Sequence, residues 1–279
     1  MFTNKKNINF LSKLIYEIDK LCRVDFSLNN IVSERDYVSN FLNFIRYPFG
    51  PFGNYKIAHS QTLNGSLEQK YGADGILIFK RGNQYKIGVF EAKIVKKRWD
   101  STIGRKPNTS RFQRQLNNQS KLNQNIAVWE MFFNIHNTKT QFDSLGSTCV
   151  KRNIALAYKK QNKLWSYSDL ENLALNSYNL NSNKPVNIEQ IIREMLSCTF
   201  GNIFEYQEGG INFYAEKENK DLKIPLINKF DDRENIASEI NMKIKKFLNE
   251  SKLYSYTHID LDTQIEAERK INIDKIFAK

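Results

Sequence analysis

Two short hydrophobic segments joined by a tight-turn sequence constrain the fold of this chain more than any other feature. Residues 74–79 (DGILIF) and 85–94 (YKIGVFEAKI) are rich in β-branched and aromatic residues, which favours strands. Residues 81–84 (RGNQ) are typical of a two-residue hairpin loop. Apolar side chains fill most positions of both hairpin faces, with Ile76, Ile78, Ile87 and Val89 on one and Leu77, Phe79, Phe90 and Ala92 on the other. Strands buried on both faces belong in a central sheet that helices cover on each side.

The segments around this hairpin predict an α/β protein. Helical spacing of apolar residues predicts helices over residues 10–21, 33–47, 110–135, 188–196 and 233–249. Strands are expected over residues 55–63 and 153–158, and a second hairpin over residues 203–215 around a Gly-Gly pair. We therefore expect a core with a central mixed sheet flanked by helices over residues 1–160. An α+β C-terminal region is expected over residues 161–279.

The turn between the two hydrophobic strands predicts which side chains face each other. If residues 82–83 form a two-residue loop, residue 81 pairs with residue 84, and each step outward pairs the next two residues until Asp74 meets Glu91. The Cβ atoms of such a pair lie roughly 4.5–5.5 Å apart. Strand alternation places Lys93 on the same face as Glu91. Three charged groups are thus expected at one end of an otherwise apolar hairpin.

Two carboxylates that face each other need a compensating positive charge. A magnesium ion would supply it, because Mg²⁺ binds through one or two carboxylates together with waters and phosphate oxygens. Asp74, Glu91 and the backbone carbonyl of Ala92 are the candidate ligands. Lys93 could stabilise negative charge that develops on a phosphoryl group or orient an attacking water. The alternative interpretation is a salt-bridged trio in which Lys93 neutralises the two acids at the end of a sheet.

The charge distribution favours a polyanionic partner. The chain carries a formal charge of +12, which suits binding to DNA or RNA. A basic segment follows the Glu91–Lys93 strand directly, and it consists of Lys96, Lys97, Arg98, Arg105, Lys106, Arg111 and Arg114. Such a run is otherwise typical of a solvated loop, but its position next to the acidic pair favours nucleic-acid binding.

Cysteine content and hydropathy predict a soluble, cytoplasmic protein. The three cysteines are scattered and lack metal-type spacing, which argues against a disulfide framework or a structural zinc site. No stretch approaches the roughly 20 apolar residues of a membrane-spanning helix, and the first residues lack the apolar block of a signal peptide.

The residues of the acidic pair resemble the motif of the PD-(D/E)XK nuclease superfamily, which includes type II restriction endonucleases, junction resolvases and repair nucleases. The matching segments are residues 72–75 (GADG) and 91–93 (EAK), with Ala73 where the family usually has proline. The resemblance covers roughly residues 31–160. It implies that Asp74 and Glu91 bind Mg²⁺, for which Mn²⁺ would substitute, and that Lys93 is catalytic.

Two further residues follow from the same resemblance. Members often carry a glutamate in the helix before the strands, and Glu34 occupies that place near the start of its helix. Glu34 could equally compensate the dipole of a first helical turn. Members also often place a glutamine or a basic residue in the helix after the Glu-x-Lys strand. Gln115 lies nearest the apolar face of that helix and is the candidate expected to point inward.

The expected function is Mg²⁺-dependent hydrolysis of DNA phosphodiester bonds, most like a type II restriction enzyme. Residues 161–279 would then serve target recognition or dimerisation, and cutting both strands of a duplex makes a homodimer a reasonable expectation. A repair or junction-resolving nuclease is an alternative within the same chemistry. A non-catalytic nucleic-acid-binding module of the same fold is the alternative outside it.

Overall fold

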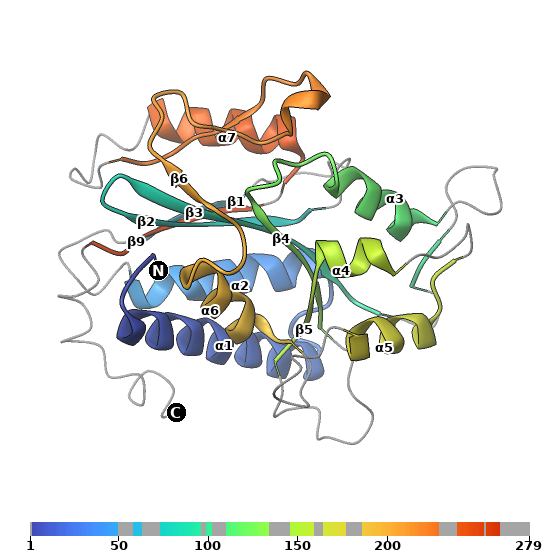
Figure 1. Ribbon diagram of the computed structural model, residues 1–279. Coiled ribbons are helices and arrows are strands. Elements are labelled where there is room, and N and C mark those ends of the chain that lie inside the picture. Colours follow the sequence, from blue (N-terminus) through green and yellow to red (C-terminus); the bar gives the residue numbers. More distant parts are fainter. Residues whose placement is uncertain are drawn as a thin grey trace.

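A seven-stranded mixed β-sheet forms the centre of the molecule (Figure 1). Six strands follow the order β1-β9-β2-β3-β4-β5, and β6 pairs separately with β3. The strands of this sheet are β1 (Ala58–Thr62), β2 (Gly75–Arg81), β3 (Gln84–Lys93), β4 (Ala127–Phe132), β5 (Thr148–Lys151), β6 (Ile203–Glu205) and β9 (Ser255–Asp260). A small second sheet consists of β7 (Ile211–Asn212) and β8 (Lys223–Ile224). The computed structural model describes residues 2–49, 58–62, 73–95, 99–101, 110–133, 146–158, 164–176, 186–228, 239–253 and 255–262.

The β2–β3 hairpin has the register that the sequence predicts. Antiparallel pairing runs from Arg81 opposite Gln84 to Gly75 opposite Phe90 without interruption. Gly82 occupies the first loop position with a φ of 55°, a left-handed conformation that two-residue hairpin loops commonly assign to glycine. The loop length and the glycine therefore fix which residues meet at the far end of the hairpin.

Helices cover both faces of the sheet, as the doubly apolar hairpin predicts. One face packs on α1 (Lys5–Ser27), α2 (Glu34–Phe49) and α6 (Ile188–Leu196), and α7 (Glu239–Ser251) lies on the other (Figure 1). Near the β4–β5 edge, α3 (Arg111–Gln119), α4 (Arg152–Ala157) and α5 (Tyr167–Asn176) enclose a further apolar cluster. The two hairpin faces separate as expected, since Leu77 and Phe90 belong to the first cluster and Ile76 and Val89 to the second.

The prediction of one long helix over residues 110–135 is wrong. Helix α3 ends at Gln119, and the chain turns before it enters β4, which runs parallel to β3. Apolar residues from Leu116 to Trp129 happen to fall at helical spacing, but the intervening SKLNQN segment favours a turn. All six residues of β4 are buried, so this strand lacks the alternation that normally reveals a strand.

Two other predicted elements also differ from the structure. Residues 152–157 form α4 and not a strand, and the strand of this region, β5, comes directly before it. Residues 203–215 do not pair with each other, because β6 joins β3 and β7 joins β8. The predicted helix over residues 233–249 corresponds to α7, and its first six residues lie outside the described residues.

Strand β9 is inserted between β1 and β2, antiparallel to the former and parallel to the latter. Strands from both sides of residue 160 thus share one sheet, and the division of the chain into two regions stays a prediction. Within the described ranges, no helix combines the length and the apolar character that crossing a bilayer requires.

Candidate active site

Asp74 lies immediately before β2, at the end of the hairpin that faces away from the turn. Its backbone amide donates to the Phe90 carbonyl oxygen at 2.7 Å, and its carboxylate Oδ2 accepts the Ala92 amide at 2.6 Å. On the other side, the amide of Ser255 on β9 donates to the Asp74 carbonyl oxygen at 3.2 Å. Only 1% of Asp74 is exposed. Both neighbouring strands therefore hold Asp74 in place.

Glu91 stands on β3 one position beyond the last hairpin pair and is completely buried. Its Oε1 accepts hydrogen bonds from the Lys93 ammonium group and, at 2.9 Å, from the Gln115 side-chain amide. Its Oε2 is buried and has no hydrogen-bond partner among the described residues. The predicted trio is thus assembled, and the Asp74 carboxyl group lies within hydrogen-bonding reach of Glu91.

The titration behaviour of the trio reflects burial and mutual charge. Burial, together with the charge of Glu91, raises the pKa of Asp74 well above its usual range. Burial also raises the pKa of Glu91, against the opposing charge and hydrogen bond of Lys93. Burial alone would lower the pKa of Lys93, but the charges of Glu91, Glu34 and Asp74 outweigh it and raise that pKa. These charges therefore favour the protonated, positively charged form of Lys93 beside the two acids.

Both supporting residues predicted from the sequence lie at this site. Gln115 is buried in α3 and contacts Glu91, as expected. Glu34 begins α2, and its Oε1 accepts the backbone amide of Ile94, directly after β3, at 2.8 Å. The charge of Glu34 raises the pKa of Asp74. Glu34 therefore joins the negative charge of the site while it anchors the end of β3.

The basic segment is described only in part. Arg111 and Arg114 lie exposed in the first turns of α3, whose N-cap residue Ser110 accepts the Gln113 amide at 2.9 Å. Lys96, Lys97, Arg98, Arg105 and Lys106 lie outside the described residues. The helix that presents the two arginines to solvent is thus the helix that presents Gln115 to Glu91.

The structure adds a residue that sequence reasoning missed. Glu130 on β4 is aligned with Glu91 in the parallel β3–β4 ladder, and neither side chain is exposed. The Gln119 side-chain amide donates to Glu130 Oε1 at 2.5 Å, whereas Glu130 Oε2 has no hydrogen-bond partner within the described part of the chain. Burial, assisted by the charge of Glu91, raises the pKa of Glu130 to about 8. Glu130 was missed because a single helix predicted over residues 110–135 does not place it on a strand beside Glu91.

The residues at the end of the hairpin fit a magnesium ion. No group of three or more histidine, cysteine, aspartate or glutamate side chains in the described ranges is arranged to hold a metal by itself. Magnesium requires fewer, because one or two carboxylates suffice when waters and substrate oxygens complete its shell. Asp74 and Glu91, with the unpartnered Oε2 of Glu91, meet that requirement. The backbone amide of Ala92 binds Asp74, and the Ala92 carbonyl as a further ligand stays a prediction.

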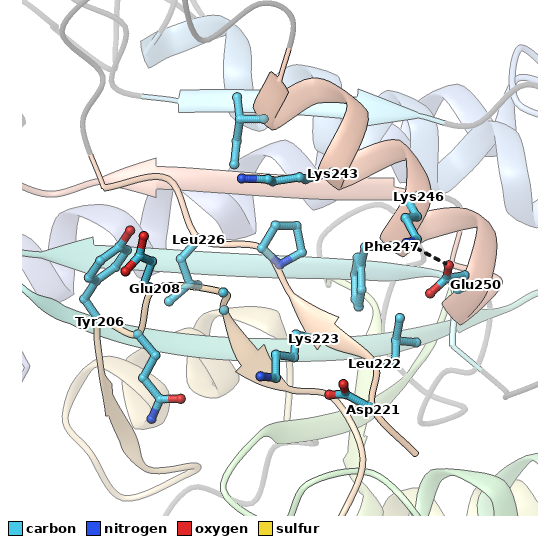
Figure 2. Close-up of a pocket in the computed structure, with 15 residues that line it drawn as sticks. Tyr206, Glu208, Asp221, Leu222, Lys223, Leu226, Lys243, Lys246, Phe247 and Glu250 are labelled. Carbon is cyan, nitrogen blue, oxygen red and sulfur yellow. Dashed lines mark ion pairs between the residues drawn. The ribbon is translucent and has the colours of Figure 1, made fainter.

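A separate cavity of about 450 Å³ lies between α7 and the β7–β8 sheet (Figure 2). Its lining mixes lysines with carboxylates, and Lys246 and Glu250, one turn apart on α7, form an ion pair at 4.0 Å. None of the described residues that line it is a predicted site residue. The acidic site at the end of the hairpin and this cavity are therefore distinct features.

Comparisons of the chain with protein-family models, with curated proteins and with solved structures returned no match.

Proposed function

We propose that this protein is a magnesium-dependent endonuclease that hydrolyses phosphodiester bonds of DNA. The observation that carries the proposal is the convergence of Asp74, Glu91 and Lys93 at the end of the β2–β3 hairpin, with Glu91 Oε2 buried and unpartnered among the described residues. A divalent cation would satisfy this oxygen, to which no donor among the described residues is directed.

Each residue of the site has a role that its contacts support. Asp74 and Glu91 would hold the magnesium ion, which when bound polarises the scissile phosphate and lowers the pKa of a water. The Lys93 ammonium group orients Glu91 and offers positive charge to the phosphoryl oxygens as negative charge develops on them. Gln115 fixes the Glu91 carboxylate through its second hydrogen bond. Glu34 anchors the end of the strand that carries Lys93.

Basic residues next to the site support DNA as the substrate. Arg111 and Arg114 stand exposed on α3, whose buried face contacts Glu91 through Gln115. Positive side chains beside a magnesium site would neutralise backbone phosphates and place a strand over the carboxylates. Together with the motif resemblance, this favours an enzyme similar to a type II restriction endonuclease, acting as a homodimer on duplex DNA.

The decisive experiment compares cleavage of DNA by the wild type with cleavage by Asp74→Asn and Lys93→Met. Both substitutions keep side-chain size, and both should abolish Mg²⁺-dependent cleavage while the protein stays folded and still binds DNA. Asp260→Asn is the matched control, because Asp260 pairs with Lys80 six residues along β2 from Asp74, roughly 20 Å away. Cleavage by Asp74→Asn at the wild-type rate would refute the mechanism.

The choice of substrate distinguishes the proposal from its alternatives. Discrete fragments from unmethylated genomic DNA would support a restriction enzyme. Intact duplex together with cut branched DNA would instead indicate a junction-resolving or repair nuclease. Tight DNA binding without hydrolysis in Mg²⁺ or Mn²⁺ would show that the chain is a binding module.

A further inference from the structure

Glu130 extends the acidic site to a third strand. Asp74 precedes β2, Glu91 lies on β3, and Glu130 lies directly beside Glu91 on the neighbouring parallel strand β4. All three side chains are buried. In a parallel ladder, aligned residues project from the same face of the sheet. Asp74, Glu91 and Glu130 therefore form a row of carboxylates across three adjacent strands, with Glu91 in the middle.

Helix α3 holds the last two acids of this row in the same way. Gln115 donates its side-chain amide to Glu91 Oε1 at 2.9 Å, and Gln119 donates its own to Glu130 Oε1 at 2.5 Å. Residues four apart lie on one face of a helix, so the two glutamines reach two neighbouring strands in parallel. The arrangement fixes one oxygen of each glutamate and leaves the other available.

The available oxygens are the second observation. Glu91 Oε2 and Glu130 Oε2 are both buried and both lack a hydrogen-bond partner among the described residues. A divalent cation that brings its own waters satisfies both oxygens at once and offsets the repulsion between the two acids.

We propose that Glu91 and Glu130 form a second divalent-cation position beside the one held by Asp74 and Glu91. This inference rests on the proposed nuclease function for the first position and adds Glu130 as a ligand of the second. Glu91 lies between the two positions and contributes to both. Gln119 is a positioning residue that acts through Glu130.

Calorimetric titration of the EDTA-treated full-length protein with Mn²⁺, in the absence of nucleic acid, tests the proposal. The wild type should bind two Mn²⁺ ions per chain and Glu130→Gln one, because the substitution removes the carboxylate charge and keeps the side-chain shape. The affinity of the remaining position should stay within a few-fold of the wild-type value. An equal number of bound ions in both proteins would overturn the proposal.

A second variant tests the same cation position in case Glu130→Gln does not fold. Gln119→Leu leaves Glu130 itself intact and should weaken only the second Mn²⁺, by roughly 10- to 100-fold as for other residues that orient metal ligands. Unchanged affinities in this variant would contradict the positioning role. A wild-type protein that binds one Mn²⁺ and still cleaves DNA would overturn the second position while the nuclease proposal stands. Binding of two Mn²⁺ ions without cleavage of any nucleic acid would support the second position and refute the nuclease.

Discussion

Replacing Gln115 by leucine tests how the site depends on helix α3. The substitution removes the amide that donates to Glu91 Oε1 at 2.9 Å and leaves Lys93 as the other partner of that oxygen. A hydrogen bond to a charged group contributes about 1.5–3 kcal/mol, which corresponds to roughly 10- to 100-fold in affinity. Gln115 lies beside Leu116 and Phe112 of an apolar cluster, so leucine should pack without unfolding the helix. We therefore expect weaker Mn²⁺ binding and slower cleavage with little change in melting temperature.

The measurement combines calorimetry with Mn²⁺, single-turnover cleavage of a labelled duplex and thermal unfolding in EDTA. Gln113→Leu is the matched control, since Gln113 lies on the same helix and bonds Asn117 at 3.3 Å instead of Glu91. A positioning role requires that the Gln115→Leu defect appear in Mn²⁺ affinity and in the cleavage step but not in DNA affinity. If the variant binds Mn²⁺ and cleaves within twofold of the wild type, the hydrogen bond to Glu91 does not organise the site.

Three further predictions concern the rest of the molecule. Burial lowers the pKa of Lys86 to about 8, so above that pH the unfolded chain binds more protons than the folded chain. Urea unfolding should therefore show the wild type gaining stability over Lys86→Met between about pH 8 and 10. Parallel pH profiles of the two proteins would contradict this. Arg114→Gln should weaken DNA binding uniformly across sequences and reduce the slope of its salt dependence by about one, as measured by fluorescence anisotropy. Gly210→Ala should destabilise the fold by more than Gly209→Ala. Both glycines have positive φ, at a cost of roughly 1–2 kcal/mol for alanine, but only at Gly210 would the added Cβ meet a backbone atom, 2.1 Å from the Ile224 oxygen.

The predictable part of the site is the part that a local turn determines. A two-residue loop at Gly82 fixes the register of β2 against β3, and the observed pairing follows it down to Gly75 opposite Phe90. Asp74 and Glu91 do not form the expected ladder pair, because the ladder ends at Gly75. The Asp74 amide instead donates to the Phe90 carbonyl oxygen, and the Asp74 carboxylate accepts the Ala92 amide. Local register thus brings the two acids together, and side-chain hydrogen bonds determine their final geometry.

The unpredicted part depends on contacts between distant segments. Glu130 belongs to a strand whose six residues are all buried, so neither strand alternation nor a charged face marks it. The parallel alignment with Glu91 arises only after the chain has passed through α3 and returned to the sheet. A sequence signal was present, because the turn-forming residues before Ala127 and the aromatic and β-branched residues after it favour a helix end followed by a strand.

The position of β9 has a consequence for the order in which the molecule can assemble during synthesis. Strand β2, which Asp74 precedes, pairs on one side with β3 and on the other with β9, which lies some 180 residues later in the chain, as in the ion pair of Lys80 with Asp260. Until β9 leaves the ribosome, β2 has an unpaired edge, and the Ser255 amide that bonds Asp74 is missing. Contacts this distant in sequence slow folding. A nascent chain therefore cannot complete the support of its acidic site before residues 255–260 have been made.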